Sequence, residues 1–509
     1  MDMPYCFARR GAAGLRFEGS ASCALGHRVG AADGIWAWWN WDGATLTAAN
    51  ERYGLYPLYR YSGPDAVGLS PSIPRLIACG ADTALDHAAL AVFLRLGFFI
   101  GEDTPFRHIR ALPPAASLSW NGTLHLTSQG RAAAPTQSLR RDAAIDAYVA
   151  LFRQSVARRA PAGSEWIMPL SGGRDSRHIL FELLQQGYQP AQCLTTQHFP
   201  PRGGEDVRIA ALLARELGLA HVVLPQPSCR FEAEQRKNLL TGFCSDEHTW
   251  YLAAMDYLLQ RKLPLYDGIG GDVLSAGLFV SPRSRALFGS CDPQAIANGL
   301  LEADEQVLAR LLPAPLLRGI SRELAVEHLA AEVALHLERP NPISSFYFWN
   351  RTRREIALVP FGLLGGLSVH APYLDHELFD LLAGMPIGLV ADHALHSDAI
   401  ARAYPRLAHL PYEDKEAPAP GAAALDARFA RRLACSLLAQ RPSALLNAGF
   451  LWPRLLGCLA SGRMAAGSAW YATQALYLHQ LGLLAQGGRN KAGGTGPCAR
   501  RRLKGAQMS

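Results

Sequence analysis

Long apolar runs are missing from the sequence: no stretch of about 18 apolar residues occurs, so we expect no membrane-spanning helix. The ten cysteines include no pair at C-x-x-C spacing, which argues against a zinc or redox motif and favours reduced, mostly buried thiols in a cytoplasmic protein. Acidic Asp2, with no apolar segment after it, predicts no signal peptide. Basic residues are not interleaved with aromatic ones, so the net charge of +7 does not predict nucleic-acid binding.

Length and composition predict two globular domains, because 509 residues exceed one compact core and 49% of them are hydrophobic. Residues 1–135 contain short strand-like runs and glycine turns, as in GIWAWWNWDGATLTAANERYGLYPLYRY, and predict an antiparallel β-rich domain. The segment AAAPTQS at 132–138 indicates a linker. We expect a second domain over residues 140–485 and a disordered basic tail over 486–509.

Strands and helices alternate in the second domain. Four strand-like runs follow one another along the chain: EWIMPL at 165–170, AQCLTTQ at 191–197, AHVVLP at 220–225 and LPLYDG at 263–268. Segments with helical spacing separate them, one of them at 204–218. This alternation predicts an α/β fold with a doubly wound parallel sheet, followed by a mostly helical extension.

The stretch PLSGGRDSRHIL at 169–180 joins the first of these strands to a helix, at the strand end where ligands of such sheets bind. Gly172 and Gly173 allow unusual φ angles and close backbone approach, and their N–H groups would face an anion. Ser171 and Ser176 add hydroxyl groups, while Asp175 suits a Mg²⁺ ion held against phosphate oxygens. The stretch is either a phosphate cradle or an ordinary capped turn, and it is not a Walker A loop, since no G-K-[ST] follows. The combination S-G-G-x-D-S, placed between a strand and a helix, favours the cradle.

A second glycine-rich turn, DGIGGD at 267–272, ends the fourth strand-like run. Asp272 in this turn is a second hard oxygen donor, so Asp175 and Asp272 could hold Mg²⁺ between two strand ends. Taken alone, the turn could equally be a glycine turn with a capping aspartate. Arg174 and Arg177 occupy the first turn of the helix, where cations are unfavourable unless a polyphosphate is bound, and so favour an occupied cradle.

The two motifs in this order resemble those of the PP-loop ATP pyrophosphatases, and more narrowly those of the asparagine synthetase-like family. Three early segments resemble pieces of that family's N-terminal glutaminase-type domain: NERYGLYPLYRY at 50–61, LSPSIPRLIACG at 69–80 and GEDTPFRHIRALPPAASLSW at 101–120. The segment VHAPYLDHELFDLLAGMP at 369–386 resembles one late in its synthetase domain. The resemblance covers about residues 1–420 and implies an Ntn-type β-rich domain followed by a PP-loop domain.

The resemblance also implies a reaction. A substrate carboxylate attacks the α-phosphate of ATP in the presence of Mg²⁺, pyrophosphate leaves, and an amine attacks the acyl-adenylate. ATP and pyrophosphate binding is implied for Ser171, Gly172, Gly173, Asp175, Ser176, Asp267 and Gly268. Lys415, in the loop LPYEDKEAPAPG, would stabilise the transition state and the leaving pyrophosphate; a solvated loop lysine is the alternative.

The sequence departs from this family at its glutaminase nucleophile. That nucleophile is a cysteine exposed as residue one, whose own amine acts as base. Here residue two is Asp2, and the nearest thiol is that of Cys6. We expect Cys6 to be structural and the glutaminase to be inactive, so that the amine comes from free ammonia or from a substrate molecule.

A second departure concerns the acid–base group. Where the family generally has a glutamate, this chain has Ser368, with His370 two residues later. His370 and Glu355 are therefore candidates for the catalytic role, although a histidine here could equally be a packing residue. Asp246, Glu247 and His248, in CSDEHTW, could line a substrate pocket or cap a helix.

Several functions remain open from the sequence. The first is an ATP-dependent amide-forming ligase that converts aspartate and ammonia to asparagine. The same architecture is shared by lasso-peptide macrolactam cyclases and β-lactam synthetases, which would take a peptide or internal amine and, for the cyclases, a precursor peptide as partner. A tRNA thiolation enzyme or NAD synthetase lacks support, since no suitable cysteines or basic RNA face are evident. The last alternative is a non-catalytic nucleotide-binding scaffold.

Overall fold

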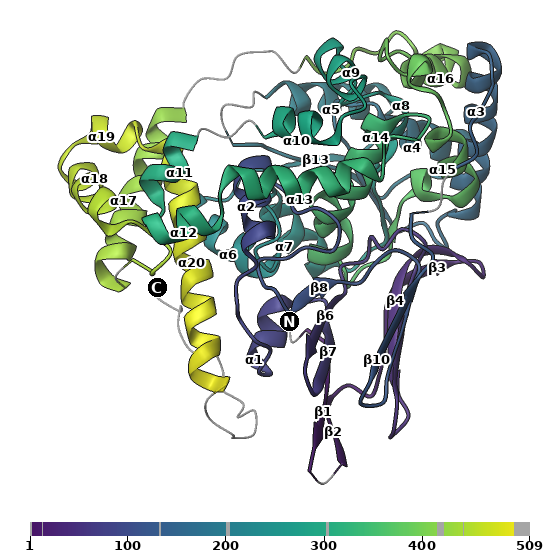
Figure 1. The fold of residues 1–509 in the computed structure, drawn as a ribbon. Helices are drawn as coiled ribbons and strands as arrows, with labels where there is room; N and C mark the ends of the chain where they lie inside the picture. The colour runs from purple at the N-terminus through teal and green to yellow at the C-terminus, as the bar shows by residue number, and fades with distance from the viewer. Residues whose placement is uncertain are drawn as a thin grey trace.

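The computed structural model describes residues 3–12, 14–131, 134–199, 204–301, 305–414, 422–440 and 442–492. In Figure 1 the N-terminal strands form a β-rich lower part, and a larger part with many helices lies above it. Antiparallel sheets and a parallel sheet are both present, which confirms the α/β class. Within these described ranges, no helix combines the length and the apolar composition needed to cross a membrane.

Two five-stranded antiparallel sheets form the N-terminal part. The first has the order β2 (Gly14–Gly19), β1 (Cys6–Gly11), β7 (Ala66–Ser70), β6 (Tyr59–Gly63) and β8 (Ile109–Ala111). The second has the order β10 (Leu124–Ser128), β9 (Ala116–Trp120), β5 (Leu46–Asn50), β4 (Asp33–Trp41) and β3 (Ser22–Val29). The alternation expected of strands is visible in β4, where Ile35, Ala37 and Trp39 are buried and the side chains between them are not.

The two antiparallel sheets contact each other through their side chains. Phe17 of β2 stacks on Trp41 of β4 with ring centroids 5.0 Å apart. Two helices between β7 and β8, α1 (Ile73–Ala78) and α2 (His87–Leu96), were not indicated by the strand-rich sequence pattern. Asp86 caps α2 by accepting a hydrogen bond from the Ala89 amide at 3.0 Å. Helix α2 then packs against α13 (Arg322–Ala334) of the larger part.

A five-stranded parallel sheet lies within the larger part. Its order is β13 (His221–Leu224), β12 (Gln192–Thr196), β11 (Ile167–Pro169), β14 (Leu265–Tyr266) and β15 (Val369–His370). The four strands expected from the sequence are confirmed, whereas β15 is a two-residue strand that the sequence did not reveal. Helix α4 (Asp175–Gln185) follows β11 and α5 (Glu205–Glu216) follows β12. The chain therefore moves outward from β11 to β13 and then returns to β14 on the other side of β11.

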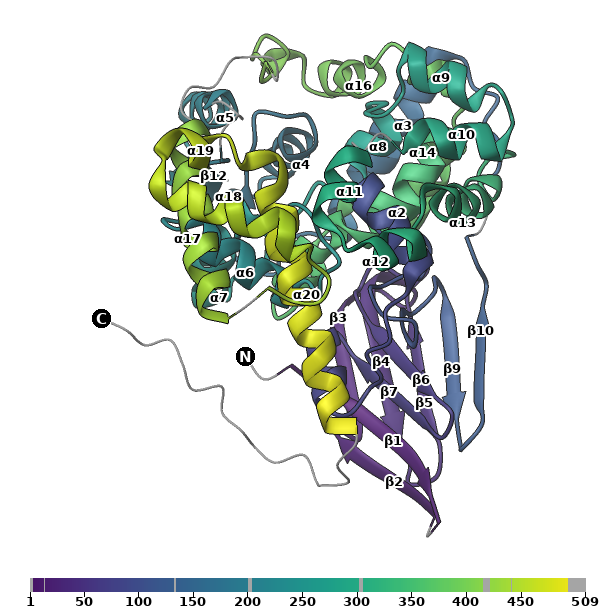
Figure 2. The same ribbon diagram turned by 60° about the vertical axis from the view of Figure 1, so that its left-hand side comes forward.

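The remaining helices surround this sheet and extend beyond it (Figures 1 and 2). They are α3 (Arg141–Arg158), α6 (Arg230–Leu240), α7 (Leu252–Arg261), α8 (Gly271–Ser275), α9 (Pro282–Phe288), α10 (Pro293–Leu300), α11 (Glu305–Leu311), α12 (Ala314–Gly319), α14 (Pro342–Tyr347), α15 (His376–Ala383), α16 (Leu395–Ala403), α17 (Ala422–Gln440), α18 (Ala448–Ala460), α19 (Gly462–Ala466) and α20 (Ala469–Ala492). In Figure 2, α17, α18 and α19 gather beside α6, and α20 runs down toward the N-terminal strands. Because α20 continues to Ala492, residues 486–492 are helical and not part of a disordered tail; residues 493–509 lie outside the described ranges.

A buried arginine joins the two parts of the chain. The Arg353 side chain is fully buried and donates hydrogen bonds to the carbonyls of Gly54, Gly101 and Leu112 at 3.3, 3.0 and 3.0 Å. A guanidinium group removed from water needs hydrogen-bond acceptors. Here these acceptors come from the β-rich part, so Arg353 is satisfied only when the two parts are docked. The segment that carries Arg353 is thereby fixed against the β-rich part.

Candidate functional site

The two glycine-rich turns lie side by side at the carboxyl ends of two neighbouring strands of the parallel sheet. The loop after β11 leads into α4, and the loop after β14 leads into α8. Strands β11 and β14 are hydrogen-bonded neighbours, and the direction in which the chain adds strands reverses between them. In open α/β sheets, the crevice outside the carboxyl ends of the strands at such a reversal is where ligands bind.

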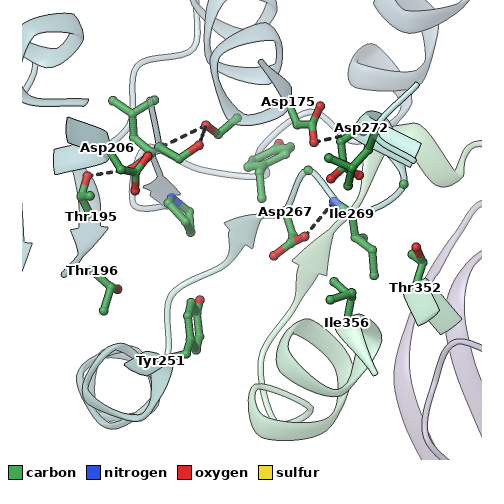
Figure 3. Close-up of a pocket in the computed structure, with 18 of the residues that line it drawn as sticks. Asp175, Thr195, Thr196, Asp206, Tyr251, Asp267, Ile269, Asp272, Thr352 and Ile356 are labelled. Carbon is green, nitrogen blue, oxygen red and sulfur yellow. Dashed lines mark hydrogen bonds between the residues drawn. The ribbon is translucent and has the colours of Figure 1, made fainter. Parts of the chain in front are cut away.

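A cavity of about 300 Å³ opens at this reversal point, and Figure 3 shows the side chains around it. Its walls include Asp175, Asp206, Asp267 and Asp272, which approach from four different loops or helix starts. Aromatic and apolar residues complete the lining: Trp250, Tyr251, Phe279, Leu278, Ile269 and Ile356. The cavity, called the first cavity below, thus combines a polar region with an apolar one, as nucleotide-sized ligands require.

The loop after β11 is held by its own polar groups. The Ser171 amide donates to Ser176 Oγ at 3.0 Å, and the Gly173 amide donates to Ser171 Oγ at 3.2 Å. The Gly172 amide donates to Asp206 Oδ1 at 2.6 Å. These three amides therefore have acceptors within the protein in this structure, and an anion contact of the Gly172 and Gly173 amides stays a prediction. Asp206 was missed as a site residue; its position at the start of the helix after the neighbouring strand was the available signal.

Glycine is required in the second turn because the Asp175 side chain fills the space beside it. A Cβ on Gly268 would lie 2.5 Å from Asp175 Cβ, and a Cβ on Gly271 would lie 2.6 Å from Asp175 Oδ1. Gly270 has a φ of 91°, in the left-handed region that favours glycine. The φ angles of Gly172 and Gly173 are not positive, so their expected unusual conformation is absent; a Cβ on Gly172 would instead meet neighbouring side chains at 2.9 and 3.0 Å.

Asp175 is oriented by contacts on both carboxylate oxygens. Its Oδ2 accepts a hydrogen bond from the Asp272 amide at 3.1 Å, and its Oδ1 lies 3.4 Å from Nδ1 of His396. The His396 ring is fully buried between Ser275 Oγ at 3.0 Å and the Tyr373 hydroxyl at 3.1 Å. Burial lowers the pKa of His396 to about 3, so the ring is neutral at physiological pH. The carboxylate predicted to hold a metal is thus positioned by Asp272, which the sequence singled out, and by His396, which it did not.

Asp175 and Asp272 fit a magnesium ion that is shared with phosphate. Within the described part of the chain, no group of three or more histidine, cysteine or acidic side chains forms a ready-made metal cage. Magnesium commonly takes one or two carboxylates and completes its coordination with phosphate oxygens and water. Both aspartates line the first cavity, from loops joined by their hydrogen bond. The donor set therefore suits Mg²⁺ bound together with a polyphosphate.

Asp267 lies deeper in the same cavity. Its Oδ1 accepts a hydrogen bond from the Ile269 amide at 2.8 Å. Burial raises the pKa of Asp267 to about 6, and the nearby Asp272 carboxylate adds to the effect. Asp267 and Gly268 thus both line the cavity, and Asp267 is able to carry a proton in mildly acidic solution.

Glu355 lines a second cavity, of about 370 Å³, that shares Phe279 and Arg351 with the first. The Asp246 amide donates to Glu355 Oε1 at 3.0 Å, and Arg351 Nε lies 3.7 Å from its Oε2. Burial raises the pKa of Glu355 to about 8; Glu247 and Asp246 add to this and Arg351 opposes it. The structure therefore places a carboxyl group that titrates near neutrality one residue from the wall of the first cavity.

His370 and Ser368 are not brought to the cavity. The His370 ring packs against His27 of β3 and Tyr266, with centroids 4.9 and 5.1 Å away, and burial lowers its pKa to about 4. Only its carbonyl approaches the site, by accepting the Asp267 amide at 2.8 Å. Ser368 precedes β15, at the opposite end of the strands from the two turns. Of the acid–base candidates, only Glu355 adjoins the first cavity.

The expected role of Arg177 is also corrected. Its guanidinium is almost completely buried and donates to the Leu410 carbonyl at 2.9 Å, and it stacks over Tyr412 at 4.0 Å. It therefore fixes the segment around Tyr412 beside the cradle, and its guanidinium is already occupied by protein acceptors. Arg174 donates through Nε to Ser397 Oγ at 2.6 Å. Lys415, further along the chain from Tyr412, lies outside the described ranges.

Comparisons with protein-family models and with curated proteins found no match to this chain.

Proposed function

We propose that this protein is an ATP-dependent amide-forming ligase of the asparagine synthetase type, which activates a carboxylate as an acyl-adenylate. The observation that carries the proposal is the pairing of Asp175 with the Asp272 amide at 3.1 Å, which joins the two glycine-rich turns at the reversal point of the parallel sheet. On this proposal the larger part is a PP-loop domain, and the β-rich part is a degenerate Ntn-type glutaminase domain.

The first half-reaction would use the first cavity. A substrate carboxylate oxygen attacks the α-phosphorus of ATP, the bond to the bridging oxygen of the β-phosphate breaks, and pyrophosphate leaves. Asp175 and Asp272 would hold Mg²⁺, which neutralises charge on the phosphate groups. Ser171 and Ser176 would offer hydroxyl groups to the pyrophosphate, and the apolar wall around Tyr251 would receive the nucleoside.

The second half-reaction would use the second cavity. An amine attacks the acyl carbon, the bond to AMP breaks, and the amine must lose a proton. Glu355 is suited to accept that proton, because a carboxyl group with a pKa of about 8 is a stronger base than an ordinary glutamate. Asp246 and Glu247 line the same cavity together with Arg95 and Arg351, so it offers carboxylates to an ammonium group and guanidinium groups to a carboxylate.

The source of the amine follows from Cys6. This thiol is fully buried in β1, and burial raises its pKa well above the ordinary value, so it is unsuited to be a nucleophile. The amine would then be free ammonia, with aspartate as carboxylate and asparagine as product, or the amine of a second substrate group. The second of these includes peptide macrolactam and β-lactam formation, and the buried Cys6 argues only against ammonia made from glutamine by this chain.

Pyrophosphate release from ATP tests the proposal. The purified protein should release pyrophosphate and AMP only when the correct carboxylate is present, among aspartate, glutamate and candidate peptides offered with ammonia or amines. Asp175→Asn should lower this rate by about a hundredfold or more while the circular dichroism spectrum stays unchanged. Formation of ADP in place of AMP would contradict adenylation. ATP binding without turnover on any carboxylate would favour the scaffold.

A further inference from the structure

A third hollow of the surface lies between helices α6 and α17, apart from the two cavities described above. It has a volume of about 430 Å³, and four arginines contribute to its walls: Arg230, Arg428, Arg431 and Arg432. Phe231 and Phe429 line it as well. Figure 2 shows the two helices next to each other on the side of the molecule that carries α18 and α19. We call this hollow the arginine cavity.

Positive charge in the arginine cavity exceeds the negative charge around it. Among the described residues, Arg428 makes no hydrogen bond or ion pair, and Arg431 donates only to the Cys458 carbonyl, at 3.4 Å. Arg230 lies 3.6 Å from Asp426, and Arg432 lies 3.2 Å from Glu232. With Glu234, which lies 3.9 Å from Arg230, three carboxylates thus face four guanidinium groups.

Arg230 gives independent evidence that the arginine cavity lacks an acceptor. Its Nε is buried and has no hydrogen-bond acceptor among the described residues; the nearest carboxylate oxygen, on Glu234, is 3.9 Å away. That glutamate is also within 3.3 Å of Lys237, so it is shared between two cations. A buried donor without an acceptor is costly, and an anionic ligand would remove the cost.

We propose that the arginine cavity binds an acidic peptide segment, with carboxylates paired to Arg428 and Arg431 and an apolar side chain against Phe231 and Phe429. Guanidinium groups bind carboxylates through paired N–H donors, and phenyl rings offer an apolar floor between them. A nucleic acid suits the site less well, because it needs basic groups along an extended backbone, whereas these arginines surround one hollow of about 430 Å³. The proposal does not depend on the ligase function.

The arginine cavity is linked to the first cavity through residues 198–199. Arg230 lies over the ring of Phe199, 5.3 Å from its centroid, and the preceding residue, His198, lines the first cavity. His198 itself packs on Trp250 with centroids 3.8 Å apart. A peptide seated in the arginine cavity would therefore contact the segment that carries His198 into the wall of the first cavity.

Fluorescence anisotropy with the full chain tests this site. The probe is a short fluorescein-labelled peptide that alternates glutamate and leucine; the matched peptide carries glutamine in place of glutamate. The acidic peptide should bind, and the double variant Arg428→Gln/Arg431→Gln should weaken binding about tenfold or more. Arg215→Gln, on α5 and outside the cavity, should bind as the wild type does.

Four results would overturn the proposal. Equal binding of the glutamine peptide, or equal binding by the double variant, would show that the carboxylates and the two arginines are not used. Displacement of the peptide by free glutamate at equal concentration would indicate a small-molecule site. Binding of an RNA oligonucleotide, lost in the double variant, together with no binding of the acidic peptide, would assign the cavity to nucleic acid. Thermal unfolding of both variants controls for loss of the fold.

Discussion

His396 Nδ1 lies 3.4 Å from Asp175 Oδ1, although the two residues are separated by more than two hundred positions in the chain. The histidine is fully buried and belongs to α16, while the aspartate begins α4. Its partners Ser275 and Tyr373 keep the ring in one orientation. The carboxylate best placed to hold magnesium thus depends on a side chain that does not itself line the first cavity.

Replacing His396 should therefore reduce the Mg²⁺-dependent rate of pyrophosphate release. We expect His396→Phe to lower pyrophosphate release about 10- to 100-fold and to raise the Mg²⁺ concentration needed for half-maximal rate. His396→Asn keeps an N–H group near the position of Nδ1 and should recover part of the rate. If both variants lose activity equally at every Mg²⁺ concentration, His396 has only a packing role.

Gly268→Ala should move Asp175, because the new Cβ would lie 2.5 Å from Asp175 Cβ. We expect a cost of about 1–3 kcal/mol in the free energy of unfolding and a loss of about a hundredfold in pyrophosphate release. Urea unfolding and the pyrophosphate assay measure the two effects. The matched control is Gly163→Ala, whose Cβ would meet no atom within 4 Å and should leave both quantities unchanged. Full activity of Gly268→Ala would place the metal-binding aspartate elsewhere.

Glu355 should make stability depend on pH. Its pKa is raised from 4.5 to about 8, so the folded state holds a proton that the unfolded state has released. The stabilisation that this proton gives is complete below about pH 4.5 and declines as the pH rises through about 8. The midpoint of thermal unfolding of the wild type should therefore fall, relative to Glu355→Gln, across this range. Parallel curves for the two proteins would contradict the raised pKa.

The same titration should appear in the rate. If ionised Glu355 accepts the proton of the amine, amide formation should rise with pH up to about 8, and Glu355→Gln should be slower without that dependence. Amide product measured by mass spectrometry separates this step from pyrophosphate release. An unchanged pH profile in Glu355→Gln would remove Glu355 from the reaction while leaving adenylation intact.

Arg353→Met should weaken the docking of the two parts of the chain and so lower the free energy of unfolding. The change removes the donor from three buried carbonyls, on Gly54, Gly101 and Leu112, and we expect it to cost about 3–5 kcal/mol in the free energy of unfolding. Arg353→Lys should not rescue the loss, since one ammonium group cannot match the planar fork. Chemical denaturation measures the change. A cost under about 0.5 kcal/mol, as expected for exposed Arg215→Ala, would mean that the contact is not stabilising.

The sequence could predict the elements that have local signals. Alternating aromatics predicted β4, apolar runs bounded by turns predicted β11 to β14, and the two glycine turns predicted which loops meet at the sheet edge. Parallel strands carry their carboxyl ends to one side, so the amino-acid sequence alone could place Asp175 and Asp272 near each other. That part of the site follows from order along the chain and strand topology.

Other features depend on tertiary packing and had no local signal. Strand β15 has two residues, too few for a pattern. Arg177 was misread because its acceptors, such as the Leu410 carbonyl, come from a distant segment. His396 could not be assigned to the cradle, since only the folded chain brings it to Asp175, whereas Asp206 had a usable signal in its place in the first turn of α5. The position of Glu355 beside Asp246 likewise spans more than a hundred residues.

The buried guanidinium of Arg353 limits which parts of this chain can be removed without altering the site. Arg351 and Thr352 line the first cavity, Arg353 is fixed to carbonyls of the β-rich part, and Glu355 lines the second cavity. Four positions within residues 351–355 therefore serve the docking of the two parts and the walls of both cavities. The β-rich part supports the shape of the site through this segment, whether or not it has a chemistry of its own, and a shortened chain without it would lose that shape along with the contact.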